Sequence, residues 1–350
     1  MSLSISVVIP THQRPESLLR VLDALSHQED VDLRRVELVV ICDGINDPGF
    51  DAVQRGWYPM RLQLAQQEQQ GPAAARNHGI ALSTGQLVVF LDDDVVPGPR
   101  LLGVHARAHE DDETLVAIGP LLPPPGHGTP WVQWEGRTVA EQYAAMARGD
   151  WEVSPRQFYT GNASVRRIHL VKAFGFDVTF PRGEDVELAF RLRDRGLHFA
   201  FLPDATAEHL AQRSYASWIA AAEDYGRFEV RMGRDRGHQD LLDAVTREFH
   251  HMHPLSRLLA RVAIRNPAIA QAAASVARPT SLLAQRAGAA GLSRYALSAA
   301  FNAVRLTGFA AEIGDARPAL ALLNRVERWP ADASVTPAPA EPQAPHGGPA

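Results

Sequence analysis

The sequence predicts an α/β fold with a largely parallel sheet in three layers, followed by an α-helical region and a low-complexity tail. Three observations support this prediction. Four short apolar segments in the first hundred residues have the length of strands, and helical patterns separate them. In the segment just before Asp92, the apolar residues run without alternation, which is typical of a sheet that helices cover on both faces. From residue 254 onward, alanine and leucine dominate, and then alanine and proline.

The predicted elements follow one another in a regular order. The expected strands are residues 4–9, 36–41, 60–64 and 86–91. Pro15 opens a helix after the first strand, because proline is favoured at the first helical position, and a second helix covers 73–82. Strands that alternate with helices in this way predict a parallel sheet.

The length of 350 residues predicts two domains or one large domain with an appendage. We expect a first domain over 1–235, an α-helical region over 236–330 and a disordered tail over 331–350, where the composition cannot bury enough apolar surface to fold. Within the helical region, residues 254–329 carry ten arginines against three acidic residues, a net charge of about +7. A basic amphipathic surface on an anionic membrane and an ordinary solvated helical face are both compatible with this pattern.

Composition excludes several classes of protein. A net charge of −5 argues against a nucleic-acid partner. The single cysteine, Cys42, excludes an internal disulfide framework. The first ten residues lack the pattern of a signal peptide, and no apolar run is long enough to span a membrane. We therefore expect a cytoplasmic protein, with a possible peripheral contact at the inner face of the membrane through 254–329.

Three consecutive aspartates, Asp92, Asp93 and Asp94, directly follow the fourth expected strand. Adjacent carboxylates repel one another, so proteins usually neutralise them with a divalent cation or with cationic side chains. Thr11 and Asp43 follow the first and second strands. The carboxyl ends of parallel strands meet at one edge, where ligands bind. This grouping favours a functional site over a solvated acidic turn.

Aromatic residues gather after a Pro/Gly-rich loop at 120–130. Three of the six tryptophans, Trp131, Trp134 and Trp151, fall in this segment. Aromatic rings beside a polar site suit an acceptor groove or stacking on a sugar. Packing of this insertion against the sheet is an equally good interpretation.

Short motifs occur in a specific order along the chain. They are Val7-Val8-Ile9-Pro10-Thr11, Asp43-Gly44, Gly71-Pro72-Ala73-Ala74-Ala75-Arg76-Asn77, Phe90-Leu91-Asp92-Asp93-Asp94, Gly161-Asn162, Gly183-Glu184-Asp185 and His209. No glycine-rich phosphate-binding motif follows a strand, which disfavours a P-loop kinase and a dinucleotide dehydrogenase. The ordered set resembles family 2 glycosyltransferases of the GT-A fold over roughly residues 4–230. That resemblance implies inverting transfer from a nucleotide-activated sugar, with a nucleotide-sugar half at 1–120 and an acceptor half at 121–235.

The resemblance also implies roles on the donor side. Asp43 is expected to accept the imide N–H of uracil, which favours a UDP-sugar and leaves guanine and thymine open. Asp92 is expected to lie near the ribose and sugar hydroxyls. Asp94 is expected to coordinate Mg²⁺ or Mn²⁺ between the two phosphates, and His209 to complete the metal shell, although a lone histidine is more often structural. The other expected substrate-binding residues are Pro10, Thr11, Arg14, Arg76, Asn77 and Asp93.

On the acceptor side, the resemblance implies that Asp185 is the general base. It lies at an expected helix N-terminus, where the dipole and free N–H groups favour an ionised carboxylate, and an ionised carboxylate can remove the acceptor hydroxyl proton. An ordinary acidic first turn is the alternative. Glu184 and Asn162 are expected to bind sugar hydroxyls. The acceptor is a hydroxyl of a glycan, a lipid-linked or a small molecule.

Two other functions remain as alternatives. A sugar-phosphate nucleotidyltransferase also collects aspartates at strand ends, but it normally has a glycine-rich loop after the first strand, where this chain has Pro10-Thr11-His12-Gln13-Arg14. A silent sugar-nucleotide-binding scaffold in polysaccharide assembly is disfavoured by the joint presence of Asp94, Asp185 and His209. Finally, His105 and His109 have the spacing of a zinc helix, but the acidic residues after them predict a solvated helix end.

Overall fold

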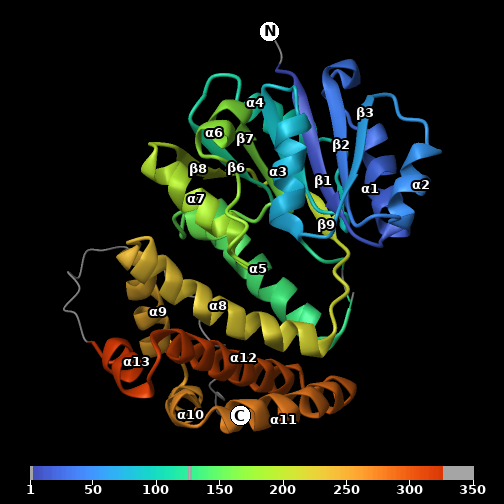
Figure 1. The fold of residues 1–350 in the computed structure, drawn as a ribbon. Coiled ribbons are helices and arrows are strands. Elements are labelled where there is room, and N and C mark those ends of the chain that lie inside the picture. Colours follow the sequence, from blue (N-terminus) through green and yellow to red (C-terminus); the bar gives the residue numbers. More distant parts are fainter. Residues whose placement is uncertain (1–2, 125, 127, 326–350) are drawn as a thin grey trace. The chain divides into compact units, whose positions relative to one another are not determined.

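The computed structural model describes residues 3–124, 126 and 128–325, and the chain divides into two compact units. Described residues within Met1–His127 and Val139–Ala211 form the first unit, and those within Gly128–Thr138 and Gln212–Ala350 form the second. Figure 1 shows the strands of the first unit and the helices of the second. The helix at Tyr215–Asp235 belongs to the second unit, although the sequence placed it in the first domain. The predicted tail lies outside the described residues.

A seven-stranded sheet forms the centre of the first unit. Its strands are β1 (Ile5–Thr11), β2 (Val36–Asp43), β3 (Arg61–Gln67), β4 (Leu87–Leu91), β6 (Leu115–Ile118), β7 (Asn162–Arg166) and β8 (His198–Phe201). Their order is β3-β2-β1-β4-β7-β6-β8, and β7 alone is antiparallel to its neighbours. The largely parallel sheet predicted from the sequence is therefore confirmed.

Helices cover both faces of this sheet. They are α1 (Pro15–Ser26), α2 (Pro48–Gln54), α3 (Pro72–Leu82), α4 (Leu101–Ala108), α6 (Arg167–Lys172) and α7 (Glu184–Asp194), with short 3₁₀ helices at Leu33–Arg35 and Pro155–Gln157. Because strand side chains alternate between faces, Val7 and Ile9 pack with the α1 and α4 side, whereas Val8 packs with α3, α6 and α7. This arrangement gives the three predicted layers.

The direction of chain growth reverses between β1 and β4, which lie side by side at the centre of the sheet. From β1, the chain builds outward through β2 to β3, and it then returns to place β4 on the other side of β1. In such sheets, ligands bind beyond the carboxyl ends of the strands at this reversal. The ends of β1, β2 and β4 therefore define where a site is expected.

A separate two-stranded sheet lies next to the end of β4. Its strands are β5 (Val95–Pro97) and β9 (Ala207–His209), which pair antiparallel with Val95 opposite His209. The backbone N–H of Leu210 donates to the carbonyl of Asp94 at 2.8 Å. This pairing holds residue 209 beside residue 94, although the two are far apart in the sequence.

Buried polar side chains anchor β7 to α4. Asn162 is fully buried, and its amide donates to the carbonyls of Pro120 at 3.0 Å and Ala205 at 2.8 Å. His105 Nε2 lies 3.0 Å from Asn162 Oδ1 and must donate to it, because that oxygen only accepts. The amide of Asn162 is therefore held by partners within the fold, and its binding to sugar hydroxyls stays a prediction.

The same network includes His109 and Ser164. Ser164 Oγ lies 2.8 Å from both His105 Nδ1 and His109 Nε2. Burial lowers the pKa of His105 to about 4 and that of His109 to about 3, so both rings are neutral at pH 7. The acidic residues after His109 are solvated, as expected, but both rings lie in the interior.

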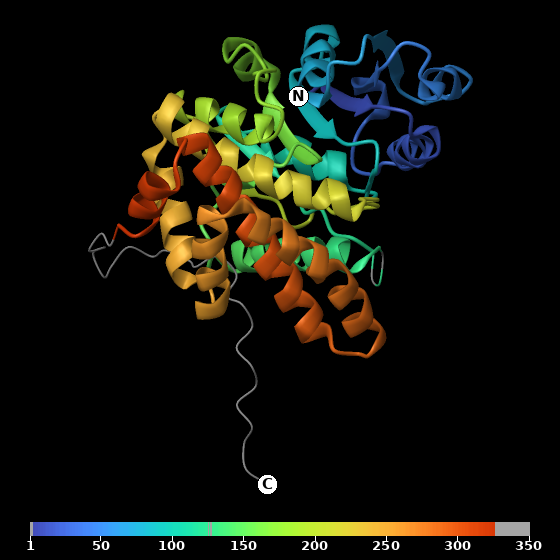
Figure 2. The ribbon, with the colours of Figure 1, turned by 60° about the horizontal axis from the view of Figure 1, so that its bottom comes forward.

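The second unit is helical. It contains α8 (Tyr215–Asp235), α9 (Gln239–His251), α10 (Pro254–Arg265), α11 (Pro267–Arg286), α12 (Ala290–Ile313) and α13 (Ala316–Leu323). Figure 1 shows α12 between α8 on one side and α10 and α11 on the other. Figure 2 shows α11 running alongside α12. Among the described residues, no helix is long and apolar enough to cross a membrane.

The aromatic segment after residue 130 is a helix, α5 (Pro130–Arg148), and not the loop-rich insertion that the sequence suggested. The residues of α5 up to Thr138 belong to the second unit. Trp131 packs edge-on against Tyr215 and donates to the carbonyl of Arg213 at 2.8 Å. Trp134 packs against Trp218 and Phe301. These two rings pack against helices of their own unit, whereas the packing interpretation expected the sheet. An acceptor role for them stays a prediction.

Replacing Asn162 by alanine should lower the free energy of unfolding by roughly 2–4 kcal/mol, because two buried carbonyls and one imidazole N–H lose their partner. Urea denaturation followed by circular dichroism measures this change. Asn302 makes a single 3.4 Å side-chain hydrogen bond on α12 and is the control, since Asn302→Ala removes little. Equal unfolding midpoints for Asn162→Ala and the unmodified protein would contradict the network.

Candidate active site

The carboxylate of Asp43 positions the loop that leads into α3. It accepts from Gln67 Nε2 at 2.9 Å, from the backbone N–H of Gln70 at 2.9 Å and from that of Gly71 at 2.8 Å. Gly71 has a φ of +91°, a backbone conformation that favours glycine. The carboxylate at the end of β2 thus positions the loop that begins α3, and it lies at the edge where β1 and β4 also end.

Arginines neutralise the acidic triplet in this structure. Arg14 Nη1 lies 3.2 Å from Asp93 Oδ1 and 3.0 Å from Asp94 Oδ2. Arg76 Nη2 lies 2.7 Å from Asp92 Oδ1. The triplet is therefore one cluster of paired charges, which excludes a simple solvated turn.

Asp93 and Asp94 differ in their environments. Asp93 is buried and accepts from Thr11 Oγ1 at 2.7 Å, yet burial dominates and raises its pKa to about 6. Burial also acts to raise the pKa of Asp94, but the hydrogen bond and charge of His209, with the charge of Arg14, hold it below its usual value. Asp94 is thus the member of this pair that the site keeps ionised at low pH.

Asp94 and His209 can share a cation. His209 Nε2 lies 3.5 Å from Asp94 Oδ1, a separation that the pairing of β5 with β9 enforces. A carboxylate oxygen and an imidazole nitrogen suit Mn²⁺, and the oxygen suits Mg²⁺. Among the described residues, no cluster of three or more such side chains occurs. The chemistry of this pair therefore fits a divalent metal, which the two residues would hold together with ligands that they do not supply themselves.

Arg76 connects the end of β4 to the start of α7. Its buried guanidinium contacts Glu184 Oε1 at 3.0 Å as well as Asp92, and its carbon Cζ lies 5.8 Å from the centre of the Phe176 ring. Burial acts against the charge, but Asp92 and Glu184 outweigh it and raise the pKa of Arg76. Arg76 therefore orients two carboxylates that the sequence assigned to the substrate.

Asp185 lies in the first turn of α7, after Gly183 in the left-handed conformation at φ +75°. Its Oδ1 accepts from the backbone N–H of Val186 at 2.8 Å. Burial, followed by the negative charge of Glu184, raises its pKa to about 7, and the charge of Arg76 offsets only part of this effect. The sequence argument expected the helix N-terminus to favour ionisation, but burial and Glu184 prevail.

Other expected substrate-binding residues have structural partners. Asn77 Nδ2 donates to the carbonyl of Phe176 at 2.8 Å, and its Oδ1 accepts from the N–H of the same residue at 2.7 Å. Pro10 is buried within β1 opposite Ile41 of β2. Trp151 is partly buried in the loop after α5. A substrate role for these three residues stays a prediction.

Two residues near the site were not found from the sequence. His12 Nδ1 lies 2.7 Å from the carbonyl of Asp43, and Asp47 is buried, with its Oδ2 accepting from the N–H of Gln13 at 2.6 Å. Asp47 also caps α2 through the N–H of Gly49. The sequence contains a signal for the role of Asp47, because an aspartate directly before a proline typically marks the start of a helix. Asp47 thus ties the loop after β1 to the start of α2.

Gly161 lies close to Asp92, where a side chain would crowd its neighbours. A Cβ on Gly161 would lie 3.1 Å from Asp92 Oδ2 and 3.0 Å from Leu121. The absence of a side chain at Gly161 leaves the outer oxygen of Asp92 uncrowded. This gives a physical reason for the glycine in the Gly161-Asn162 pair.

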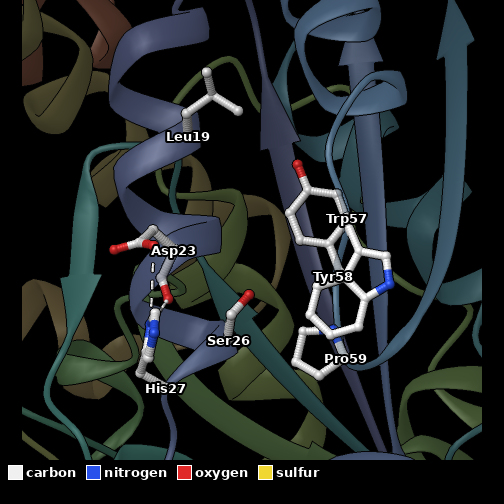
Figure 3. Close-up of a pocket in the computed structure, with 7 residues that line it drawn as sticks. All are labelled: Leu19, Asp23, Ser26, His27, Trp57, Tyr58 and Pro59. Atoms are coloured by element: carbon white, nitrogen blue, oxygen red, sulfur yellow. Dashed lines mark hydrogen bonds and ion pairs between the residues drawn. The ribbon is translucent and has the colours of Figure 1, made fainter.

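A pocket of about 390 Å³ lies away from these carboxylates. It is lined by Leu19, Asp23, Ser26, His27, Trp57, Tyr58 and Pro59, so that α1 forms one wall and the segment before β3 the other (Figure 3). Since α1 ends and β3 begins at the edge of the sheet opposite the strand carboxyl ends, this pocket is separate from the site described above.

Known proteins share this sequence pattern. The family model described as "Glycosyltransferase like family 2" matches residues 3–227. A pre-mycofactocin glycosyltransferase of Mycobacterium tuberculosis is 29% identical over 228 residues, which cover 63% of this chain and 46% of that protein. A validoxylamine A glucosyltransferase of Streptomyces hygroscopicus is 30% identical over 226 residues, covering 55% of this chain and 52% of the relative. The chain spans about half the length of these relatives.

Solved structures share the fold. The mannosyltransferase PcManGT of Pyrobaculum calidifontis, in complex with GDP-Man and Mn²⁺, has a TM-score of 0.53 and 21% identity, covering 92% of this chain and 79% of its own. TarS 1-349 of S. aureus, in complex with UDP, also has a TM-score of 0.53, with 17% identity, covering 89% and 92% of the two chains. The fold and the extent of the family match together show that this chain belongs to the family 2-like glycosyltransferases.

Proposed function

We propose that this protein transfers a sugar, with inversion, from a nucleotide-sugar to an acceptor hydroxyl. The observation that carries the proposal is the placement of two functional groups on neighbouring elements. An ionised Asp94 beside His209 lies at the end of β4, and a basic carboxylate, Asp185, begins α7. Arg76 links the two places through Asp92 and Glu184.

The donor binds at the carboxyl ends of β1, β2 and β4 in this proposal. Asp43 accepts from the base, which favours uracil, and Asp92 accepts from the ribose or sugar hydroxyls. Arg14 is about half exposed and supplies positive charge for the diphosphate. Asp94 and His209 would hold Mg²⁺ or Mn²⁺, which when bound stabilises the negative charge on the leaving diphosphate.

The acceptor hydroxyl is activated by Asp185. A general base works best when its pKa lies near the operating pH, and a pKa of about 7 meets that condition. Glu184 keeps this pKa high through its charge, and Arg76 holds Glu184 in place. Asp185 takes the hydroxyl proton while the acceptor oxygen attacks the anomeric carbon and the nucleoside diphosphate leaves.

The relatives support the class of donor. Structural neighbours are complexed with UDP or with GDP-Man and Mn²⁺. Because the nucleotides in these complexes carry different bases, the neighbours do not decide between uracil and guanine. We favour UDP here because of Asp43. The named acceptors of the relatives differ, and we propose only that the acceptor is a hydroxyl of a glycan, a lipid-linked or a small molecule. A cytoplasmic location, peripheral to the inner face of a membrane, belongs to the same proposal.

A sugar-phosphate nucleotidyltransferase and a silent scaffold are less well supported. A nucleotidyltransferase does not require a general base that acts on an acceptor hydroxyl. The raised pKa of Asp185 would then have no role in the reaction. A scaffold does not require an ionised Asp94 beside a histidine. Family membership favours transfer over both.

Replacing Asp185 by asparagine should reduce transfer by a factor of at least about 10², because the amide cannot take the acceptor proton. Nucleotide affinity should stay unchanged, since Asp185 does not contact the diphosphate in this proposal. Product formation and calorimetric binding of nucleotide measure the two effects. Asp240→Asn, in the first turn of α9, is the matched control. Full activity of Asp185→Asn would remove this residue as the base.

Transfer should also depend on pH. The active form of Asp185 is ionised, so kcat/KM should fall about tenfold for each pH unit below about 7 and level off above it. Donor binding measured over the same range separates this effect from the titration of Asp93 near pH 6. A kcat/KM that stays constant from pH 8 down to pH 5.5 would be incompatible with a base of this pKa.

A further inference from the structure

Helix α10 exposes an apolar stripe. Leu255 and Leu258 are 62% and 58% exposed, and Val262 is exposed on the same face, because residues three and four apart are neighbours on a helix. The opposite face buries Ala260 and Ala263. The stripe points away from the helices that pack on α10.

Helix α11 repeats this arrangement. Val276 and Leu283 lie seven residues apart on one face, and each is 64% exposed. Ala270, Ala274 and Ala277 on the opposite face are buried. Both α10 and α11 pack against α12, and they form the side of the second unit that Figure 2 brings forward. Large apolar side chains exposed on adjoining elements usually mark an interaction surface.

The charge around these stripes has one sign. Residues 254–311 contain seven arginines and no aspartate or glutamate. One of the seven, Arg305, is buried and paired with Glu229 and Glu248, so it serves the fold. Arg265, Arg278 and Arg286 are exposed on α10 and α11. The surface therefore presents apolar side chains together with uncompensated positive charge from its own helices.

We propose that this surface binds an anionic lipid membrane. The α10–α11 face is defined by Leu255, Leu258, Val262, Val276 and Leu283 with Arg265 and Arg286. Arg278 is also exposed, but it lies two residues from Val276 and therefore on another side of α11. The apolar side chains of the α10–α11 face enter the headgroup region and its arginines contact lipid phosphates, as in other amphipathic helices that lie on membranes. A second copy of the chain fits less well, because a symmetric contact would bring like charges together.

This inference gives the proposed peripheral location a surface and a partner, and it does not depend on the transfer reaction. The closing experiment uses the full chain without donor or acceptor. A failure of the proposed transferase activity would leave vesicle binding intact, and a failure of vesicle binding would leave transfer to a water-soluble acceptor intact.

The experiment is flotation with vesicles of one part phosphatidylglycerol to two parts phosphatidylcholine. The protein should float with these vesicles at low salt and not with pure phosphatidylcholine. Binding should be lost in about 1 M salt, where the Debye length is about 3 Å. Equal flotation with neutral vesicles, or none with anionic ones, would overturn the proposal.

Two sets of substitutions locate the surface. Leu255→Ser with Leu258→Ser and Val262→Ser should reduce the partition coefficient at least about tenfold. The control triple Ile168→Ser, Val171→Ser and Val178→Ser removes exposed apolar residues of the first unit and should bind normally. Arg265→Gln with Arg286→Gln should also reduce binding at least about tenfold. Arg20→Gln with Arg35→Gln is its control.

The assignment to the α10–α11 face would be contradicted if both sets of test variants bound vesicles normally. It would also be contradicted if the test and control variants lost vesicle binding equally. Circular dichroism checks that each variant is folded. Sedimentation without vesicles measures whether the protein is a monomer or a dimer. A dimer that dissociates when Leu255, Leu258 and Val262 become serine would assign the face to a second copy and overturn the lipid proposal.

Discussion

The candidate site depends on the buried guanidinium of Arg76. A buried charge is costly unless it is paired and hydrogen-bonded. Asp92 at the end of β4 and Glu184 at the start of α7 supply the two carboxylates that meet this requirement. Removing the guanidinium would leave these carboxylates without their partner, and breaking such a pair typically costs about 3–5 kcal/mol. One side chain thus fixes the relation between the strand ends and the helix that carries Asp185.

Electrostatics then divides the remaining carboxylates by function. Asp94 is held in its ionised form by His209 and Arg14 in spite of burial, which is the state that a cation ligand needs. Asp185 is shifted in the opposite direction by burial and by Glu184, which is the state that suits a base near neutral pH. Two aspartates on neighbouring elements therefore differ in acidity because their surroundings differ.

The sequence predicted the centre of the fold well because β1, β2 and β4 are short, largely apolar and regularly separated by helices. The ends of β1, β2 and β4 followed from that pattern, and with them the grouping of Thr11, Asp43 and the triplet. Predictions that depended on side-chain surroundings did less well. Asn162 was assigned to the substrate because it ends the Gly161-Asn162 motif, whereas the structure shows three buried partners that hold its amide.

The other differences have similar causes. The sequence placed Trp131 and Trp134 in a loop because a proline- and glycine-rich segment precedes them, yet they lie on a helix and pack against α8 and α12. The expected ionisation of Asp185 relied on the helix N-terminus alone and could not include Glu184 or the depth of burial.

A metal-dependent nucleotide-sugar site at the end of β4 is tested most directly by thermal unfolding with UDP, GDP or dTDP, each with and without Mn²⁺. With UDP at about 100 times its dissociation constant, we expect a rise in the unfolding midpoint worth about 2.7 kcal/mol. The rise should require metal, disappear in Asp94→Ala and persist in Asp194→Ala. No shift with any nucleotide, or an undiminished shift in Asp94→Ala, would contradict a metal-dependent nucleotide-sugar site at the end of β4.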